Sequence, residues 1–302
     1  MFKQKLKYLI IPTLLVFTAA SFVWFFVNHP EYWEKLKSVS PWVIGIVVVL
    51  NIPMLLILTF LSDMTIKLCG RSINKRENFI LTAYSTLVNF FGPLQSGPGV
   101  RAAYLKARHR VRIKDYTLAS LLLLAIFAII NLLFLLIGTR PWGQVTLLLV
   151  VLGLFGYLIF GYIEKRDTNI NESKFRLNSK LLAGIIIGTF VQVSLMVVWY
   201  YIELKSVDQG VHFSQAVSYT GAANFSLFVS ITPAGAGFRE AFLILSKNIH
   251  HVSTGDIASA NLIDRVSYVI FLGLLFLLVL SMHAKQKIVK MKRLSVTNAD
   301  KE

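Results

Sequence analysis

Hydrophobic residues along this chain gather into long runs that alternate with shorter polar and basic stretches. The long runs cover residues 8–27, 41–62, 116–138, 144–162, 181–202 and 257–282. Each is near the ~20 apolar residues that an α-helix needs to cross the hydrocarbon core of a bilayer. The pattern therefore predicts an all-α polytopic membrane protein with about six full spans.

Two further apolar segments, 78–105 and 213–245, are interrupted by glycine and proline. Each interruption carries two glycines and an arginine at the same spacing: Gly97, Gly99 and Arg101 in the first, Gly235, Gly237 and Arg239 in the second. Glycine tolerates positive φ, and Pro233 has no N–H to donate, so we expect the backbone to leave the helix at both places. Neither half of a broken segment is long enough to span, which predicts two re-entrant helical hairpins.

Three predicted spans separate the two hairpins, so the hairpins should enter the membrane from opposite faces. Paired interruptions of this kind are typical of inverted-topology repeats in transporters. We predict a single transmembrane domain at 1–284, with repeat units at about 41–138 and 181–283. A basic cytoplasmic tail without regular structure is expected at 285–302.

The charge distribution favours one orientation of the chain. The chain has 31 Lys and Arg against 15 Asp and Glu, a formal net charge of +16. If the N-terminus is cytoplasmic, most of the basic residues fall on the cytoplasmic side, as the positive-inside rule requires. We therefore predict a multi-pass protein of the cytoplasmic membrane with both termini in the cytoplasm. The positive charge is attributed to topology and anionic lipid rather than to nucleic acid.

Arg239 is predicted in the first turn of a half-helix that starts near Phe238. There the helix dipole, free N–H groups and the guanidinium all attract an anion, and arginine can bind phosphate with two hydrogen bonds. Arg101 is the equivalent residue in the first segment. The alternative is that each arginine only extends to the membrane interface and pairs with lipid there.

Asp264 and Arg265 lie inside the predicted last span, where a charge costs on the order of 3 kcal/mol on insertion scales. Adjacent residues do not share a helix face, so each needs a partner elsewhere, and Glu240 is the expected partner of Arg265. Asn261 lies one turn before Arg265 and could join it. The alternative is a purely structural salt bridge. Asparagines upstream of the two glycine pairs are expected to cap or bond the interrupted backbone: Asn89 and Asn224.

The sequence does not indicate catalysis. The serines near the interruptions lack the histidine and aspartate pattern of a nucleophilic site, the pair His250-His251 has no matching carboxylates, and there is no phosphate-binding loop. We expect no enzymatic activity, no cofactor and no metal. The single cysteine, Cys69, excludes an intramolecular disulfide.

With these residues in view, the chain resembles the membrane domain of the lysylphosphatidylglycerol synthase/flippase family. The resemblance is carried by TPAGAGFRE at 232–240 and by Arg265 within NLIDRVSY, and it covers about 6–282. Two positions depart from the family motifs: Ala102 stands where a glutamate is usual, and Ala234 replaces a glycine. The aminoacyl-transferase domain of the full-length enzymes is absent from the sequence, which implies translocation at most.

The leading interpretation is flippase-like translocation of an anionic phospholipid or a polyprenyl-phosphate-linked lipid, by alternating access between the two hairpins. Arg101, Arg239 and Arg265 are the expected headgroup ligands. The alternative is an accessory membrane subunit that does not transport but presents a lipid-linked substrate to a partner transferase. The sequence leaves a homodimer open and indicates no nucleic acid partner.

Overall fold

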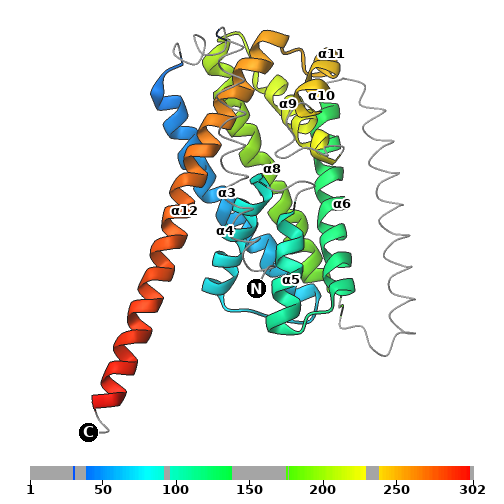
Figure 1. The fold of residues 1–302 in the computed structure, drawn as a ribbon. Helices are drawn as coiled ribbons and strands as arrows, with labels where there is room; N and C mark the ends of the chain where they lie inside the picture. Colours follow the sequence, from blue (N-terminus) through cyan, green and yellow to red (C-terminus); the bar gives the residue numbers. More distant parts are fainter. Residues whose placement is uncertain are drawn as a thin grey trace, which may run out of the picture.

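The computed structural model describes residues 30, 39–91, 96–137, 175, 177–228 and 238–299, with side chains omitted at 91, 137 and 283–299. Within these ranges the regular elements are helices (Figure 1). The predicted spans at 8–27 and 144–162 lie outside the described residues. So does the second interruption, including Pro233, Gly235 and Gly237.

Four described helices are long enough and apolar enough to cross a membrane. They are α3 (Pro41–Leu68), α6 (Ile113–Ile137), α8 (Ser179–Val207) and α12 (Thr254–Ala299). They match four of the predicted spans and form the body of the molecule, with α3 packed along α8. The protein is thus an all-α polytopic membrane protein, as the hydropathy pattern predicts.

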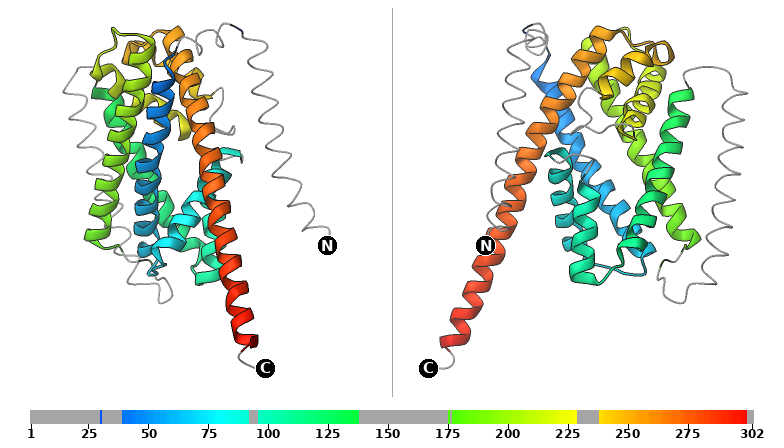
Figure 2. Two further views of the ribbon diagram at one scale, coloured as in Figure 1. Left: turned by 90° about the vertical axis from the view of Figure 1, so that its left-hand side faces the viewer. Right: turned by 45° about the vertical axis from the view of Figure 1, so that its right-hand side comes forward.

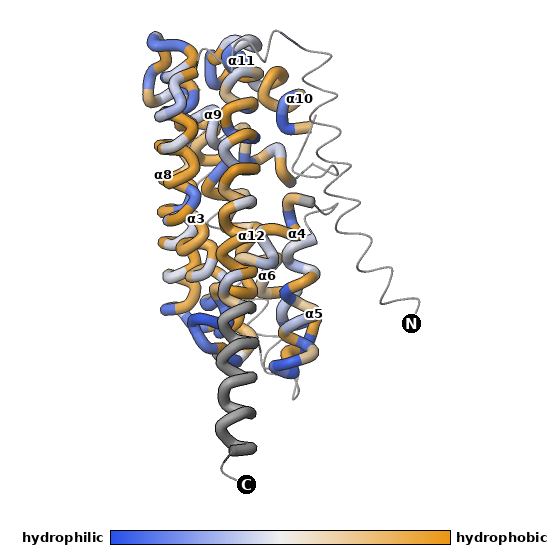
Figure 3. Tube along the Cα trace, turned by 60° about the vertical axis from the view of Figure 1, so that its left-hand side comes forward, coloured by the Kyte–Doolittle hydropathy of each residue, from blue (hydrophilic) through white to orange (hydrophobic). Residues whose placement is uncertain are grey.

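Helix α3 exposes apolar side chains and buries polar ones, as a helix in contact with lipid requires. Trp42, Val49 and Phe60 are among the large apolar side chains that this helix exposes, whereas polar Asn51 and Thr65 are buried. The buried polar groups bond to the backbone one turn earlier: Asn51 Nδ2 donates to the Val47 carbonyl, and Thr65 does the same at Leu61. Figure 3 shows hydrophobic residues predominating along the middle of the bundle. An apolar exterior of this kind is stable in hydrocarbon.

Short helices form two groups at opposite ends of the bundle (Figure 2). The first group is α4 (Lys75–Phe91) and α5 (Gly97–His109), which pack on each other near the end where α3 stops. The second group begins with α9 (Phe213–Phe225) and the 3-10 turn η2 (Ser226–Phe228). It continues with α10 (Phe238–Leu245) and α11 (Lys247–His250). The helices therefore follow the same order twice: a long helix, a group of short ones and a second long helix.

The predicted break of the helix at Gly97 and Gly99 is wrong. Gly97 and Gly99 form the first turn of α5, and neither has positive φ. Proline is favoured at a helix start, and Pro98 there lets the helix begin at Gly97. Gly97 is needed for space instead, because a Cβ atom would lie 2.7 Å from the Ser85 carbonyl oxygen of α4. The predicted capping role of Asn89 is confirmed, since its Oδ1 accepts the Gly97 N–H at 3.3 Å.

Three helices continue beyond their predicted ends, and the first is α3, which ends at Leu68 where the predicted span ends at residue 62. The expected irregular tail at 285–302 is wrong, because α12 runs to Ala299. The stretch after Met282 contains no Gly or Pro and is rich in Lys, which favours helix. Likewise α8 ends at Val207, beyond the predicted span 181–202, so Glu203 lies in the helix.

Glu77, in the first turn of α4, bonds to side chains in the second half of α5. Its Oε1 accepts the Tyr104 hydroxyl at 2.6 Å and lies 2.8 Å from His109 Nε2, with Arg108 Nε at 3.4 Å. Burial acts to raise the pKa of Glu77, but the two hydrogen bonds and the charges of His109 and Arg108 outweigh it and lower the pKa below 4.5. The carboxylate therefore stabilises the pair as an ion.

Glu77→Gln should lower the free energy of unfolding near neutral pH by about 1 to 3 kcal/mol, because charged hydrogen bonds are lost. Because the folded pKa is lowered, this stabilisation is present above the ordinary pKa and disappears as the pH falls through the lowered value. Thermal unfolding in detergent across the acid range measures it. Asp63→Asn is the matched control: its ion pair with Lys67 is partly exposed, so the change should be small. Equal pH profiles for wild type and Glu77→Gln would contradict the assignment.

Candidate functional site

Two neighbouring residues of α10 pair with two neighbouring residues of α12. Arg239 Nη1 lies 2.5 Å from Asp264 Oδ2, and Arg265 Nη2 lies 2.5 Å from Glu240 Oε1. The pair of Glu240 with Arg265 is the one that the sequence predicts, and it is confirmed. The two pairs cross between the helices, and each charge is thereby neutralised by the opposite helix.

Arg239 is the more enclosed of the two arginines. Its side chain is 11% exposed, and so is that of Asp264. Arg239 Nη2 donates to the Tyr200 hydroxyl at 3.0 Å, and its Cζ lies 5.2 Å from the centroid of the Tyr200 ring. The Nε–H is buried and has no partner among the described residues. One N–H of the guanidinium therefore stays unused in this arrangement.

A cavity of about 260 Å³ lies where the two groups of short helices meet the long ones. Arg239, Asp264 and Arg265 line it, together with Asn89 of α4 and Asn224 of α9. The asparagines upstream of the two glycine pairs thus line one cavity, although 134 residues of chain lie between them. Further polar side chains from the helices around it also line the wall: Asn51, Thr86 and Gln192.

The other predicted site residues lie apart from this cavity or outside the described ranges. Arg101 of α5 donates a hydrogen bond to Tyr116 of α6 and is not among the cavity-lining residues. Gly97 and Gly99 form the start of α5. Asn261 is 3% exposed on α12, and neither its Oδ1 nor its Nδ2 has a partner among the described residues.

Among the described residues, Asn224 bonds to the side chain of another asparagine. Its Nδ2 donates to Asn131 Oδ1 of α6 at 2.9 Å. The contact is made possible by Gly221, because a Cβ atom at that position would lie 2.3 Å from the Leu135 backbone nitrogen. The close approach of α9 to α6 therefore positions Asn224 at the cavity wall.

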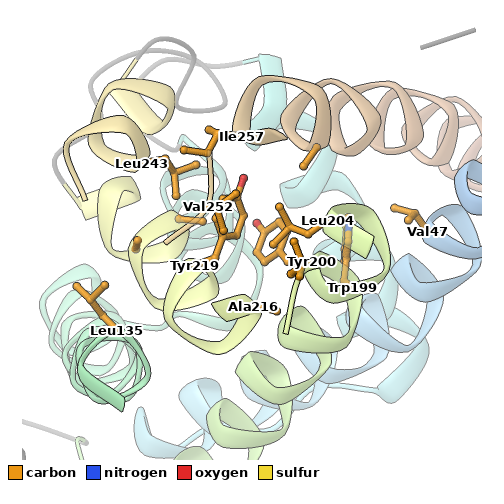
Figure 4. Close-up of a cluster of buried hydrophobic side chains, with 14 of the residues drawn as sticks. Val47, Leu135, Trp199, Tyr200, Leu204, Ala216, Tyr219, Leu243, Val252 and Ile257 are labelled. Atoms are coloured by element: carbon orange, nitrogen blue, oxygen red, sulfur yellow. The ribbon is translucent and has the colours of Figure 1, made fainter. Parts of the chain in front are cut away.

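Sequence reasoning missed the residues that α8 contributes. Tyr200 and Trp199 line the cavity, and Glu203, one turn further, is fully buried. Figure 4 shows the Tyr200 and Tyr219 rings beside each other in the core, and their centroids are 5.5 Å apart. The spacing of Trp199 and Glu203 by four residues was the available signal, because it places both on one face if the helix continues.

Within the described ranges, no group of three or more His, Cys, Asp or Glu side chains could hold a metal ion. The chemistry that the cavity offers is hydrogen bonding from guanidinium and amide groups. Phosphate oxygens are preferred acceptors for arginine. An anion could replace the carboxylate on either arginine, and each guanidinium would then still have an anionic partner.

The fold and this charged cavity define a polytopic α-helical membrane protein with an internal polar site. The chain belongs to the family described as the lysylphosphatidylglycerol synthase TM region, whose family model matches residues 7–276. The match covers most of the chain and relates the protein to membrane lipids. A search of the curated proteins and a search of the solved structures gave no match.

Proposed function

We propose that the protein translocates the anionic headgroup of a phospholipid or of a polyprenyl-phosphate-linked lipid across the cytoplasmic membrane. The proposal depends chiefly on the cavity that Arg239 and Arg265 line, whose wall also includes residues of α4 and α9. Membership of a lipid-related membrane family supports it. The apolar outer faces of α3 and α12 give the lipid tails a surface to follow while the headgroup is inside.

Alternating access would use the two groups of short helices as re-entrant hairpins of an inverted repeat. The pair α4/α5 lies at one end of the bundle and α9/α10 at the other (Figure 2). Basic residues around α4 and α5 favour the cytoplasm for the first end: Arg71, Lys75, Arg76, Lys106, Arg108, Arg110, Arg112 and Lys114. Movement of one hairpin would then open the cavity to the cytoplasm and movement of the other to the far side.

Headgroup binding proceeds in this proposal by exchange of anions on arginine. A phosphate oxygen replaces Asp264 on Arg239 or Glu240 on Arg265, and the unused Nε–H of Arg239 adds a hydrogen bond. The exchange keeps each arginine paired with an anion throughout, which avoids the cost of an unpaired buried guanidinium. Release on the far side restores the carboxylate contacts. No step requires a nucleophile, a cofactor or a metal, and the protein in this proposal is not an enzyme.

The test is lipid movement by purified protein in liposomes that contain a fluorescent phosphatidylglycerol. The double variant Arg265→Gln/Glu240→Gln removes one cavity arginine without leaving its partner charged. Loss of charged hydrogen bonds worth about 1.5 to 3 kcal/mol should slow movement by roughly 10- to 100-fold. Arg76→Gln, a change at an exposed arginine of α4, is the control and should behave as wild type. Unchanged movement in the double variant would count against the proposal.

A second candidate function is favoured by the pairing itself. Both cavity arginines are already neutralised by carboxylates, which suits them to hold α10 against α12. A protein of this kind could present a lipid-linked substrate to a partner transferase without moving it. Co-purification of a transferase, together with no lipid movement by the wild-type protein alone, would support this candidate over translocation.

A further inference from the structure

Glu203 is a buried carboxyl group near the end of α8. It is 0% exposed. The Trp199 indole N–H donates to its Oε1 at 2.5 Å, and its Oε2 has no hydrogen-bond partner among the described residues. A carboxylate in such a place lacks the cation and the hydrogen bonds that normally compensate a buried charge. The geometry fits a neutral carboxyl with its proton on Oε2.

The groups that face Glu203 come from four helices. Tyr200 precedes Glu203 by three residues on α8, and its hydroxyl accepts a hydrogen bond from Arg239 of α10. Asp264 of α12 pairs with that arginine, and the Tyr219 ring of α9 lies against the Tyr200 ring. The two Nη groups of Arg239 are already used by Asp264 and Tyr200. The Tyr219 hydroxyl is buried and has no partner among the described residues.

Two other cations near this end of α8 have partners elsewhere: Lys205 Nζ donates to the Gln209 and Val211 carbonyls, and Arg265 pairs with Glu240. The described charged residues of α3 and α6 are in the turns at the opposite end of the bundle: Asp63, Lys67, Lys114 and Asp115. His250 of α11 stacks on Tyr219, but its ring nitrogens contact the Leu243 carbonyl and the Val252 N–H. An ionised Glu203 would therefore depend on Arg239.

We propose that Glu203 is a proton-binding site that couples headgroup binding at Arg239 to proton uptake. This inference rests on the proposed function. With Glu203 protonated, only Asp264 and the headgroup phosphate compete for the Arg239 guanidinium. With Glu203 ionised, a third anion competes and expels the headgroup. When the pH rises above the titration of the headgroup-free protein, the proton on Oε2 is lost to water. In that pH range one proton passes from water to Glu203 Oε2 when a headgroup binds and returns to water when it leaves, and no other covalent bond changes.

This linkage gives the protein a means to use a pH difference across the membrane. A headgroup bound on the more acidic side carries a proton with it through Glu203, and both leave on the less acidic side. By reciprocity, the proton strengthens headgroup binding by the same factor by which the headgroup strengthens proton binding.

The test measures binding of a short-chain phosphatidylglycerol to the full chain in detergent, as a function of pH. Once the pH exceeds the value at which Glu203 loses its proton, wild-type affinity should fall by up to about tenfold per pH unit, which is the slope for one proton. Glu203→Gln mimics the neutral carboxyl, so its affinity should match that of wild type at low pH and not change with pH. Asp208→Asn alters an exposed carboxyl at the C-cap of the same helix, and this variant should show the wild-type pH dependence of binding.

Infrared difference spectroscopy supplies a readout that is independent of lipid. Wild type should show the carbonyl band of a protonated carboxyl, shifted by isotope-labelled glutamate and absent from Glu203→Gln. Glu203→Met is a second neutral variant if the glutamine form does not fold. The same pH dependence of binding in wild type and Glu203→Gln, or an unchanged band, would overturn the coupling alone. No probe binding to wild type at any pH would overturn the proposed function and the coupling together.

Discussion

Replacement of Arg239 by methionine should lower the free energy of unfolding by about 3 to 5 kcal/mol, the usual cost of leaving one member of a buried ion pair unpaired. The partner left behind is Asp264, which has little exposed area and lies 2.5 Å from Arg239 in the wild type. Tyr200 loses its hydrogen bond as well. Chemical or thermal unfolding of the purified protein in detergent would measure the loss.

A double variant separates the structural role of this pair from its role in binding. Arg239→Met/Asp264→Leu replaces both charges with apolar groups of similar size, which is often neutral or stabilising in a buried site. We expect most of the lost stability to return while movement of phosphatidylglycerol in liposomes stays absent. If the double variant moves lipid at the wild-type rate, the ion pair is structural only. If Arg239→Met alone is as stable as wild type, the burial of the pair is contradicted.

Gly221→Leu should destabilise the protein by about 3 kcal/mol or more, above the range of ordinary overpacking, because it forces two helix backbones apart. A Cβ atom at Gly221 would lie 2.3 Å from the Leu135 nitrogen and 2.5 Å from the Asn131 carbonyl oxygen. Backbone atoms cannot rotate away as a flexible side chain can. The hydrogen bond from Asn224 to Asn131, which depends on this close approach, should be lost too.

Gly99→Ala is the matched control for this prediction. A Cβ atom at Gly99 would meet nothing within 4 Å, and alanine favours helix over glycine by up to about 1 kcal/mol. Thermal unfolding in detergent should therefore show a large loss for Gly221→Leu and no loss, or a small gain, for Gly99→Ala. Equal melting temperatures for Gly221→Leu and wild type would show that α9 does not pack this closely on α6.

Hydropathy predicted the four described long helices well because each residue contributes to membrane transfer nearly independently of its neighbours in space. The pairing of Glu240 with Arg265 was also predictable, since a charge at bilayer depth needs an opposite charge. The ends of α8 and α12 were not predictable in the same way. Polar residues usually mark the end of a span, yet Glu203 stays in α8 with a hydrogen bond from Trp199.

The two glycine motifs show where sequence reasoning reaches its limit. Gly97 and Gly99 look equivalent in the chain, but only Gly97 has the α4 backbone against it. Arg101 and Arg239 occupy equivalent motif positions, yet Arg101 bonds to Tyr116 while Arg239 lines the cavity. Such differences depend on which helix packs against each residue, and the local sequence does not specify that helix.

The sequence by itself determined the class of protein, the long helices and the need for partners at Arg265 and Asp264, because hydrophobic transfer and charge burial act on each segment separately. Only the tertiary structure decided that Asn89 and Asn224 meet at one cavity, that Arg239 pairs with Asp264 and that Glu203 is enclosed beside them. Those contacts join segments far apart in the chain, and their geometry depends on how closely the helices pack.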